Sequence, residues 1–309
     1  MNACLRLVVV GWLLLAAPIA SAQERGRRAR GESLVDAQVQ SEVRLYRKAP
    51  EGELFLHLYF PQGWNAADTR PAIVLFFGGG WRTGSYEQFA AQAEYFASRG
   101  LVAAAADYRI FTQHHTTPDK AVEDAKAAMR WMRAHAGELG VDANKIIAAG
   151  GSAGGHLAAA TATLEDFDAP GDDAKVSCQP CALVLFNPVL NFTGMKERMF
   201  FNDDVENDEM KKKLSPTLHL TKNTPPAILF YGAEDKFLSQ GEEYVARAKE
   251  LGVRAELYVA PKMSHGFFNR TPWTAVTTRA ADDFLESLGY LQGEPTLKMP
   301  ANAPKLEKR

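Results

Sequence analysis

One serine in this sequence has surroundings that suit nucleophilic chemistry. Ser152 stands at the centre of Gly150-x-Ser152-x-Gly154, between the apolar run 146–149 and the helix-favouring run 157–160. A serine at such a strand-to-helix turn occupies strained backbone, and the flanking glycines leave room that a Cβ would fill. The turn also places the hydroxyl at a helix N-terminus, where free N–H groups favour a developing oxyanion. An ordinary glycine-rich turn is the alternative, so the assignment depends on what accompanies the motif.

A nucleophilic serine needs a base, and the base is normally a histidine held by a carboxylate. In the chain order Ser, Asp or Glu, His, the base follows Ser152, which leaves His219 and His265 outside the helix after the serine. His219 lies in an irregular segment, whereas His265 precedes Gly266 in a loop after the last predicted strand. We therefore expect His265 to be the base. We expect His156, one helical turn beyond Ser152, to be structural.

Two carboxylates are placed to orient that base. Glu234 and Asp235 both follow the apolar strand predicted at 227–231. Their position alone leaves the choice between them open. An ordinary turn carboxylate is the alternative for either residue.

A second glycine cluster could supply the oxyanion site. Gly78-Gly79-Gly80 directly follows the apolar run 72–77. Backbone N–H groups of glycines can approach a ligand closely because no Cβ intervenes. We expect the N–H groups of Gly79, Gly80 and Ala153 to bind an oxyanion formed by serine attack. A merely flexible loop is the alternative.

The pattern of elements would bring these residues to one edge of a sheet. Strand-like and helix-like runs alternate from Ala72 onward, after a hairpin with strands predicted at 43–46 and 54–60. This alternation predicts an α/β fold with a mostly parallel central sheet and helices on both faces. The candidate residues come just after predicted strands, and ligands of such sheets bind at the carboxyl ends of the strands.

The length and the charge balance of the chain bear on its number of domains and on its partners. The 309 residues suffice for one large α/β domain, and 35 Lys and Arg nearly balance 37 Asp and Glu. The balance gives no argument for nucleic acid or an anionic membrane surface as a partner. Nothing in the pattern fixes the oligomeric state.

The first 22 residues match an export signal. Arg6 supplies a positive charge, residues 7–17 are apolar, and Ala20-Ser21-Ala22 fits cleavage before Gln23. The apolar run is short for a membrane span, so stable membrane insertion is not expected, with an uncleaved anchor as the alternative. We therefore expect a secreted or periplasmic protein.

The remaining chain divides by composition. An Arg-rich stretch follows the signal, a long irregular insert interrupts the alternation, and a stretch containing Pro and Lys ends the chain. Cys178 and Cys181, the pair left after export, would form a small structural disulfide or remain thiols. The predicted boundaries are a signal peptide at 1–22, a flexible leader at 23–41, the α/β domain at 42–290 with a small lid insert at about 191–220, and a disordered tail at 291–309.

Five motifs in order carry a resemblance to a known family: Phe77-Gly78-Gly79-Gly80-Trp81, Asp107-Tyr108-Arg109, Gly150-Gly-Ser152-Ala-Gly154-Gly-His156, Gly232-x-x-Asp235 and His265-Gly266-Phe267. Over roughly 53–288 the chain resembles the esterase and lipase branch of the α/β-hydrolases. It is similar to hormone-sensitive-lipase-like enzymes and to acetylxylan or feruloyl carbohydrate esterases.

The resemblance implies a triad of Ser152, Asp235 and His265, since the family's spacing selects Asp235 over Glu234. It implies an oxyanion hole from the glycine loop and the residue after the serine, and neither cofactor nor metal. One position departs from the family pattern: Phe77 stands where a histidine usually precedes the three glycines. The geometry of the oxyanion loop therefore stays open at this point.

The implied activity is that of an exported serine carboxylic-ester hydrolase, which would remove short acyl groups from carbohydrate esters. A general carboxylesterase or lipase acting on small or lipid esters is one alternative. A binding protein that keeps the α/β-hydrolase fold without catalysis is another.

Overall fold

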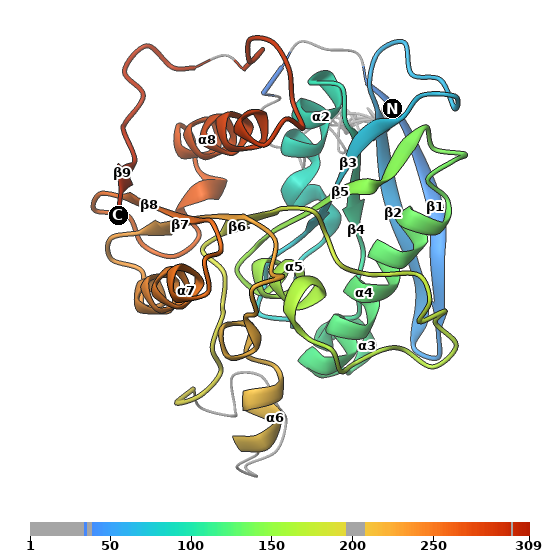
Figure 1. Cartoon of the computed structure of the whole chain (residues 1–309), viewed down its shortest axis with the longest axis horizontal. Coiled ribbons are helices and arrows are strands. Elements are labelled where there is room, and N and C mark those ends of the chain that lie inside the picture. The colour runs from blue at the N-terminus through green and yellow to red at the C-terminus, as the bar shows by residue number, and fades with distance from the viewer. Residues whose placement is uncertain (1–33, 36–38, 196–207, 298) are drawn as a thin grey trace, which may run out of the picture.

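The computed structural model describes residues 34–35, 39–195, 208–297 and 299–309. Within them the strands are β1 Gln40–Ala49, β2 Gly52–Phe60, β3 Arg70–Phe76, β4 Val102–Ala106, β5 Val141–Gly151, β6 Leu183–Phe186, β7 Ala227–Gly232, β8 Ala255–Ala260 and β9 Glu307–Lys308. These described strands form one sheet in the order β1-β2-β4-β3-β5-β6-β7-β8-β9 (Figure 1). The strands from β4 to β8 in that order pair in parallel, and β1, β2 and β9 are antiparallel additions at the edges.

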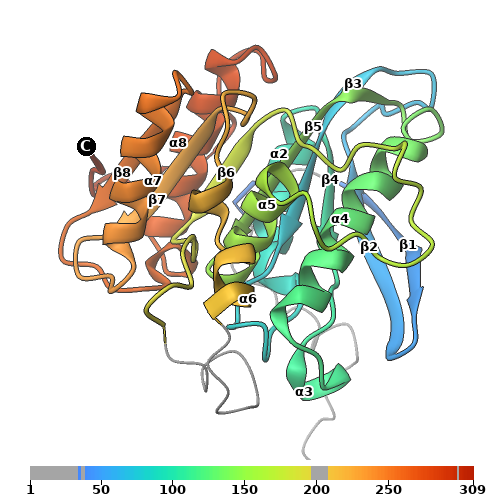
Figure 2. The same ribbon diagram turned by 60° about the horizontal axis from the view of Figure 1, so that its bottom comes forward.

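Helices cover both faces of the sheet (Figures 1 and 2). One face carries α2 (Ala90–Ser98) and α8 (Trp273–Ser287), and the other carries α4 (Pro118–Ala134), α5 (Ala153–Thr163) and α7 (Leu238–Glu250). The shorter helices are α3 Phe111–His114, α6 Asp208–Lys213, η1 Tyr86–Phe89, η3 Pro216–His219 and η4 Phe267–Asn269. The predicted mostly parallel sheet with helices on both faces is confirmed.

The central strands are apolar because they are buried on both sides. All five residues of β4 are buried, and so are the five at the end of β3, from Ala72 to Phe76. A strand covered by helices on both faces has no solvated side, so it lacks the polar alternation of an exposed sheet. This rigid centre carries the loops that follow β3, β5, β7 and β8.

Both edges of the sheet extend beyond the predicted limits. The hairpin ladder begins at Gln40, which pairs with Phe60, so the sheet starts inside the leader predicted at 23–41. The tail predicted as disordered at 291–309 forms β9, in which Lys308 pairs with Tyr258. An edge strand offers unpaired N–H and C=O groups, and polar residues can use them without a hydrophobic pattern. The prediction of a disordered tail at 291–309 is therefore wrong at its end, where β9 forms.

Some predictions fall on residues outside this description. The signal peptide at 1–22, most of the leader and residues 196–207 of the insert lie there. Among the residues that are described, no helix has the length and apolar character needed to cross a membrane. The end of the insert, which is described from residue 208 on, packs on α5. There His156 Nε2 donates to the Leu214 carbonyl at 2.8 Å.

Candidate active site

Ser152 occupies a strained turn between β5 and α5. Its backbone has φ 53° and ψ −114°, a conformation that costs energy for a residue with a side chain. The turn is tight because strand and helix touch. A Cβ on Gly150 would lie 2.3 Å from the Gly154 carbonyl oxygen, and one on Gly154 would lie 2.0 Å from that of Phe76. The glycines of the motif are therefore required sterically, as predicted.

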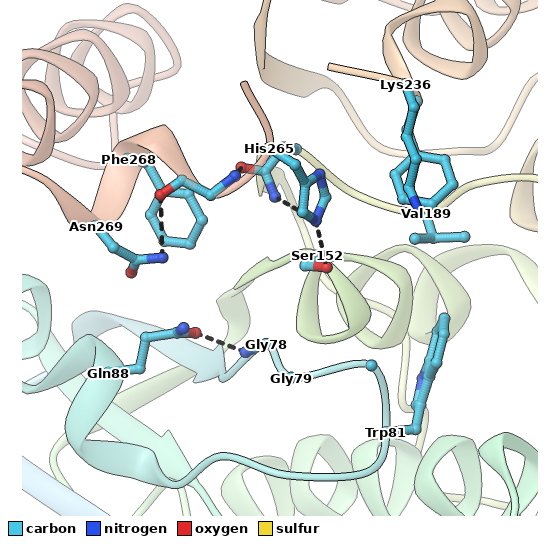
Figure 3. A pocket seen from close by; sticks show the side chains of 14 residues that line it. Gly78, Gly79, Trp81, Gln88, Ser152, Val189, Lys236, His265, Phe268 and Asn269 are labelled. Carbon is cyan, nitrogen blue, oxygen red and sulfur yellow. Dashed lines mark hydrogen bonds between the residues drawn. The ribbon is translucent and has the colours of Figure 1, made fainter. Parts of the chain in front are cut away.

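Two hydrogen bonds connect the three residues implied by the resemblance. The Ser152 Oγ lies 2.8 Å from His265 Nε2 (Figure 3), and His265 Nδ1 donates to Asp235 Oδ2 at 2.8 Å. The Asp235 carboxylate is fully buried, whereas 31 % of the imidazole is exposed. A buried carboxylate on Nδ1 fixes the tautomer and leaves Nε2 free to accept a proton from the serine.

The local backbone decides which acid faces the histidine. Asp235 Oδ1 accepts a hydrogen bond from Phe237 N at 2.9 Å, which leaves Oδ2 for His265. Glu234 lies exposed on the outside of the same turn. The other candidate base, His219, donates from Nε2 to the Lys212 carbonyl at 3.0 Å. The structure thus brings Asp235 to His265 and leaves Glu234 and His219 apart from it.

Asn187 also contacts the histidine loop, a role that the sequence did not reveal. It is buried directly after β6, with φ 37°. Its Oδ1 accepts from Gly266 N at 3.1 Å, and its Nδ2 lies 3.5 Å from His265 Nε2. The next carbonyl, of Pro188, accepts from the Tyr231 hydroxyl at 2.7 Å. The only sequence signal was its position at the end of a strand.

The glycine loop lines the cavity and is held by a side chain at its first glycine. Gly78 N donates to Gln88 Oε1 at 2.6 Å (Figure 3). Gly79 and Gly80 have φ values of 130° and 64°, which side chains rarely adopt, and both line the cavity beside Ser152. The loop can therefore present N–H groups near the hydroxyl, and Gln88 is a supporting residue that the sequence did not indicate.

Phe77 takes the place of the family's usual histidine without leaving the loop unsupported. Its ring stacks on Tyr108, with centroids 4.1 Å apart and 19° between the planes. The Tyr108 hydroxyl donates to the Phe77 carbonyl at 2.7 Å. Burial raises the pKa of Tyr108, so the phenol stays protonated and remains a donor. Stacking and this hydrogen bond brace the start of the loop.

The serine and histidine open into a cavity of about 340 Å³. Trp81, Val189, Phe237 and Phe268 provide most of its apolar lining (Figure 3). Phe268 is buried and stacks on Phe89, with centroids 5.6 Å apart. A small apolar group next to the Ser152 hydroxyl would therefore lose its contact with water.

The cysteine pair lies away from this cavity. Cys178 and Cys181 are both free thiols, and Cys178 Sγ donates to the Thr161 carbonyl at 3.6 Å. Burial raises the pKa of both thiols, which lowers their reactivity. Of the two alternatives left open, the structure contains the pair of thiols.

Comparisons with a family model and with individual proteins agree on what this chain is similar to. The model of the BD-FAE family matches residues 56–246. Esterase LipC of Mycobacterium tuberculosis is 29% identical over 226 residues, which cover 66% of this chain and 56% of LipC. The ethyl acetate hydrolase of Pseudomonas putida is 26% identical over 228 residues, which cover 69% of this chain and 70% of that enzyme. This chain thus spans little more than half the length of LipC.

Solved structures of one esterase share the architecture. The apo form of Thermogutta terrifontis esterase 2 has a TM-score of 0.77 and 43% identity, covering 82% of this chain and 97% of that one. Its propionate-bound form gives a TM-score of 0.76 and 41% identity, with 82% and 96% covered. Its form phosphorylated by paraoxon gives 0.76 and 42%, with 82% and 96% covered.

Proposed function

Because this chain belongs to the BD-FAE family of α/β-hydrolase-fold serine esterases, we propose that it is an exported carboxylic-ester hydrolase that removes short acyl groups from carbohydrate esters. The observation that carries the hydrolase assignment is the unbroken chain of hydrogen bonds from Ser152 Oγ through His265 to Asp235. A hydroxyl in line with an imidazole and a buried carboxylate can be deprotonated as it attacks.

Acylation follows from this geometry. Ser152 Oγ attacks the ester carbonyl carbon while its proton passes to His265 Nε2, 2.8 Å away. Asp235 stabilises the imidazolium through the Nδ1 hydrogen bond, and the alcohol then leaves with the proton from Nε2. Ser152 is left as an acyl ester.

The negative charge that develops on the carbonyl oxygen needs donors that are already in place. We assign the N–H groups of Gly79, Gly80 and Ala153 to that oxygen, and Gly78 N is excluded because Gln88 accepts from it. In deacylation, water gives a proton to His265 and attacks the acyl carbon. Collapse of the second tetrahedral intermediate returns that proton to Ser152 and releases the carboxylic acid.

The proposal of a short acyl group rests on a structural neighbour. In this chain Trp81 and Phe268 give the cavity of about 340 Å³ an apolar wall against which an acyl group can pack. Thermogutta terrifontis esterase 2, a structural neighbour, has been solved with propionate and with butyrate bound. We therefore assign acyl groups of about two to four carbons to this chain.

The alcohol is proposed to be a sugar because the chain resembles carbohydrate esterases in its motifs and its first 22 residues match the pattern of an export signal. Small neutral esters are the second candidate, favoured by the similarity to ethyl acetate hydrolase and to esterase LipC. The two candidates share the same acylation chemistry and differ in what occupies the cavity mouth.

A substrate panel separates them. Turnover should be measured on acetylated xylan, a feruloyl sugar ester and 4-nitrophenyl acetate, butyrate and octanoate, with Ser152→Ala as the blank. We expect kcat/KM to be highest for acetylated carbohydrate and to fall from butyrate to octanoate. Turnover of the nitrophenyl esters without any deacetylation of xylan would move the assignment to small esters.

Export is tested separately, on the full-length chain expressed in a bacterial cell. After fractionation, N-terminal sequencing should give a mature chain starting at Gln23 in the periplasm or medium. Retention of Met1 in a cytosolic or membrane-bound protein would contradict this part of the proposal.

A further inference from the structure

The cavity at Ser152 carries one fixed positive charge on its lining. Among the described residues that line it, only His265 and Lys236 have ionisable side chains. The others are glycines, neutral polar residues and apolar side chains. A charged substrate would therefore meet a single cation and no carboxylate on the surface of this cavity.

Lys236 is held near the reacting groups through an aromatic ring. Its ammonium lies 4.7 Å from the centroid of Phe237, and that ring meets His265 edge-on with centroids 5.3 Å apart. The hydrogen bond from Phe237 N to Asp235 Oδ1 fixes the intervening turn. Figure 3 shows Lys236 beside Val189, on one side of the Ser152 hydroxyl.

The charge of Lys236 is not neutralised by the protein. Within the described part of the chain Lys236 forms no ion pair, and its side chain is exposed. Exposed Glu234, two residues earlier, makes no ion pair with it either. Some other exposed cations are paired, as Lys308 is with Glu256 at 2.6 Å. Contact with an aromatic ring orients an ammonium but leaves its charge available to an anion.

We propose that Lys236 makes this enzyme selective for esters that carry a carboxylate near the scissile bond. The proposal rests on the proposed esterase function and narrows its substrate class. The carboxylate can belong to the acyl part, as in the half-ester of a dicarboxylic acid, or to the alcohol part, as in an acylated uronic acid. In either case it would pair with the ammonium where Phe237 and Val189 partly exclude water, which strengthens the attraction.

The test uses matched esters that differ in one charge. For the acyl part the pair is monoethyl succinate and ethyl butyrate; for the alcohol part it is 4-acetoxybenzoate and 4-acetoxybenzamide. Hydrolysis is followed by pH-stat at pH 7 and low salt for the wild-type chain, Lys236→Met, Lys236→Arg and Lys249→Met. Lys249 is an exposed lysine of α7 outside the cavity lining, so its variant changes net charge equally.

We expect the anionic-to-neutral ratio of kcat/KM to fall roughly fivefold in Lys236→Met for one of the two pairs. That pair identifies the part of the substrate that bears the carboxylate. Lys236→Arg should retain most of the ratio, and Lys249→Met all of it. Added salt should lower the ratio for the wild-type chain and not for Lys236→Met.

An unchanged ratio in Lys236→Met for both pairs would overturn the assignment of Lys236, even if every ester were hydrolysed. An equal loss in Lys249→Met would overturn it as well, because the effect would then come from net charge. A wild-type chain inactive on all four esters would instead contradict the proposed esterase function, and the inference with it.

Discussion

Two polar regions are centred on residues that come after parallel strands of the same sheet, and their hydrogen bonding differs. In the Arg109 cluster (Glu51, Arg109, Glu123 and Asp124) the arginine comes after β4 and its acids come from the β1–β2 turn and from α4, whereas Ser152 comes directly after β5. The Arg109 guanidinium, 2 % exposed, donates to carboxylates of all three acids at 2.8 to 3.0 Å. The Ser152 hydroxyl has one hydrogen-bond partner among the described residues, and the residue has a strained backbone with an open cavity beside it.

The difference separates structural from reactive polar groups. Arg47 and Lys120 also pair with acids of the Arg109 cluster, so each of its carboxylates already has a cation and nothing remains for a ligand to satisfy. At Ser152 the strained turn places the hydroxyl on a cavity, where a substrate can contact it. Tyr108 links the two regions: it directly precedes Arg109, and its hydroxyl donates to the Phe77 carbonyl at the start of the glycine loop.

The largest effect should come from replacing Asp235, the acid that contacts His265. Asp235→Asn replaces the acceptor of His265 Nδ1 with an amide that disturbs the tautomer, so kcat on 4-nitrophenyl butyrate should fall about 10³- to 10⁴-fold. Glu234→Gln, one residue away and exposed, is the matched control and should keep activity near that of the wild type. Similar losses in both variants would remove the distinction between the two carboxylates.

The Arg109 cluster should respond in stability. Arg109→Met leaves the buried Asp124 carboxylate without its main partner, and we expect the free energy of unfolding in urea to fall by about 3–5 kcal/mol. Arg279→Met breaks the exposed pair with Asp283 and should cost less than about 1 kcal/mol. If Arg109→Met unfolded at the same urea concentration as the wild type, the cluster would not have the structural role described here.

His156 should make the free energy of unfolding depend on pH. Burial lowers its pKa to about 4, so the unfolded chain binds a proton at higher pH than the folded chain does. The contribution of neutral His156 to the free energy of unfolding is then fully present above about pH 6.5 and is lost as the pH falls towards 4. Glutamine can keep the hydrogen bond to Leu214 without titrating.

We therefore expect the unfolding free energy of the wild type to drop by about 3 kcal/mol more than that of His156→Gln between pH 7 and 4. Urea denaturation at a series of pH values gives both curves. Parallel curves would show that residue 156 does not titrate in this range.

The smallest effect should come from the support of the glycine loop. Gln88→Ala removes the acceptor of Gly78 N, and we expect kcat to fall about tenfold with little change in KM. Gln113→Ala, at an exposed position on α3, is the control. A change confined to KM would place Gln88 in substrate binding instead of loop support.

Sequence patterns predicted those parts of the site that local backbone geometry constrains. The Ser152 turn needs glycines at 150 and 154, and His265 is followed by Gly266, so both left a local signature. Choosing Asp235 over Glu234 needed the family's spacing, since both follow the same strand.

Contacts between distant positions left no such signature. Gln88 reaches Gly78 only because η1 packs back on the loop, and Phe268 reaches Gly151 only through the folded core. The Pro and Lys content of residues 291–309 predicts disorder. The pairing of β9 depends on the open edge of β8, which its own residues do not reveal.

The most direct test of a nucleophilic Ser152 is covalent labelling by paraoxon, followed by intact-mass measurement and peptide mapping. We predict one diethylphosphoryl group per chain on the peptide that contains Ser152, with esterase activity lost in proportion to labelling. Full activity after complete exposure, or an adduct on another residue accompanied by the same loss, would contradict a nucleophilic role for Ser152.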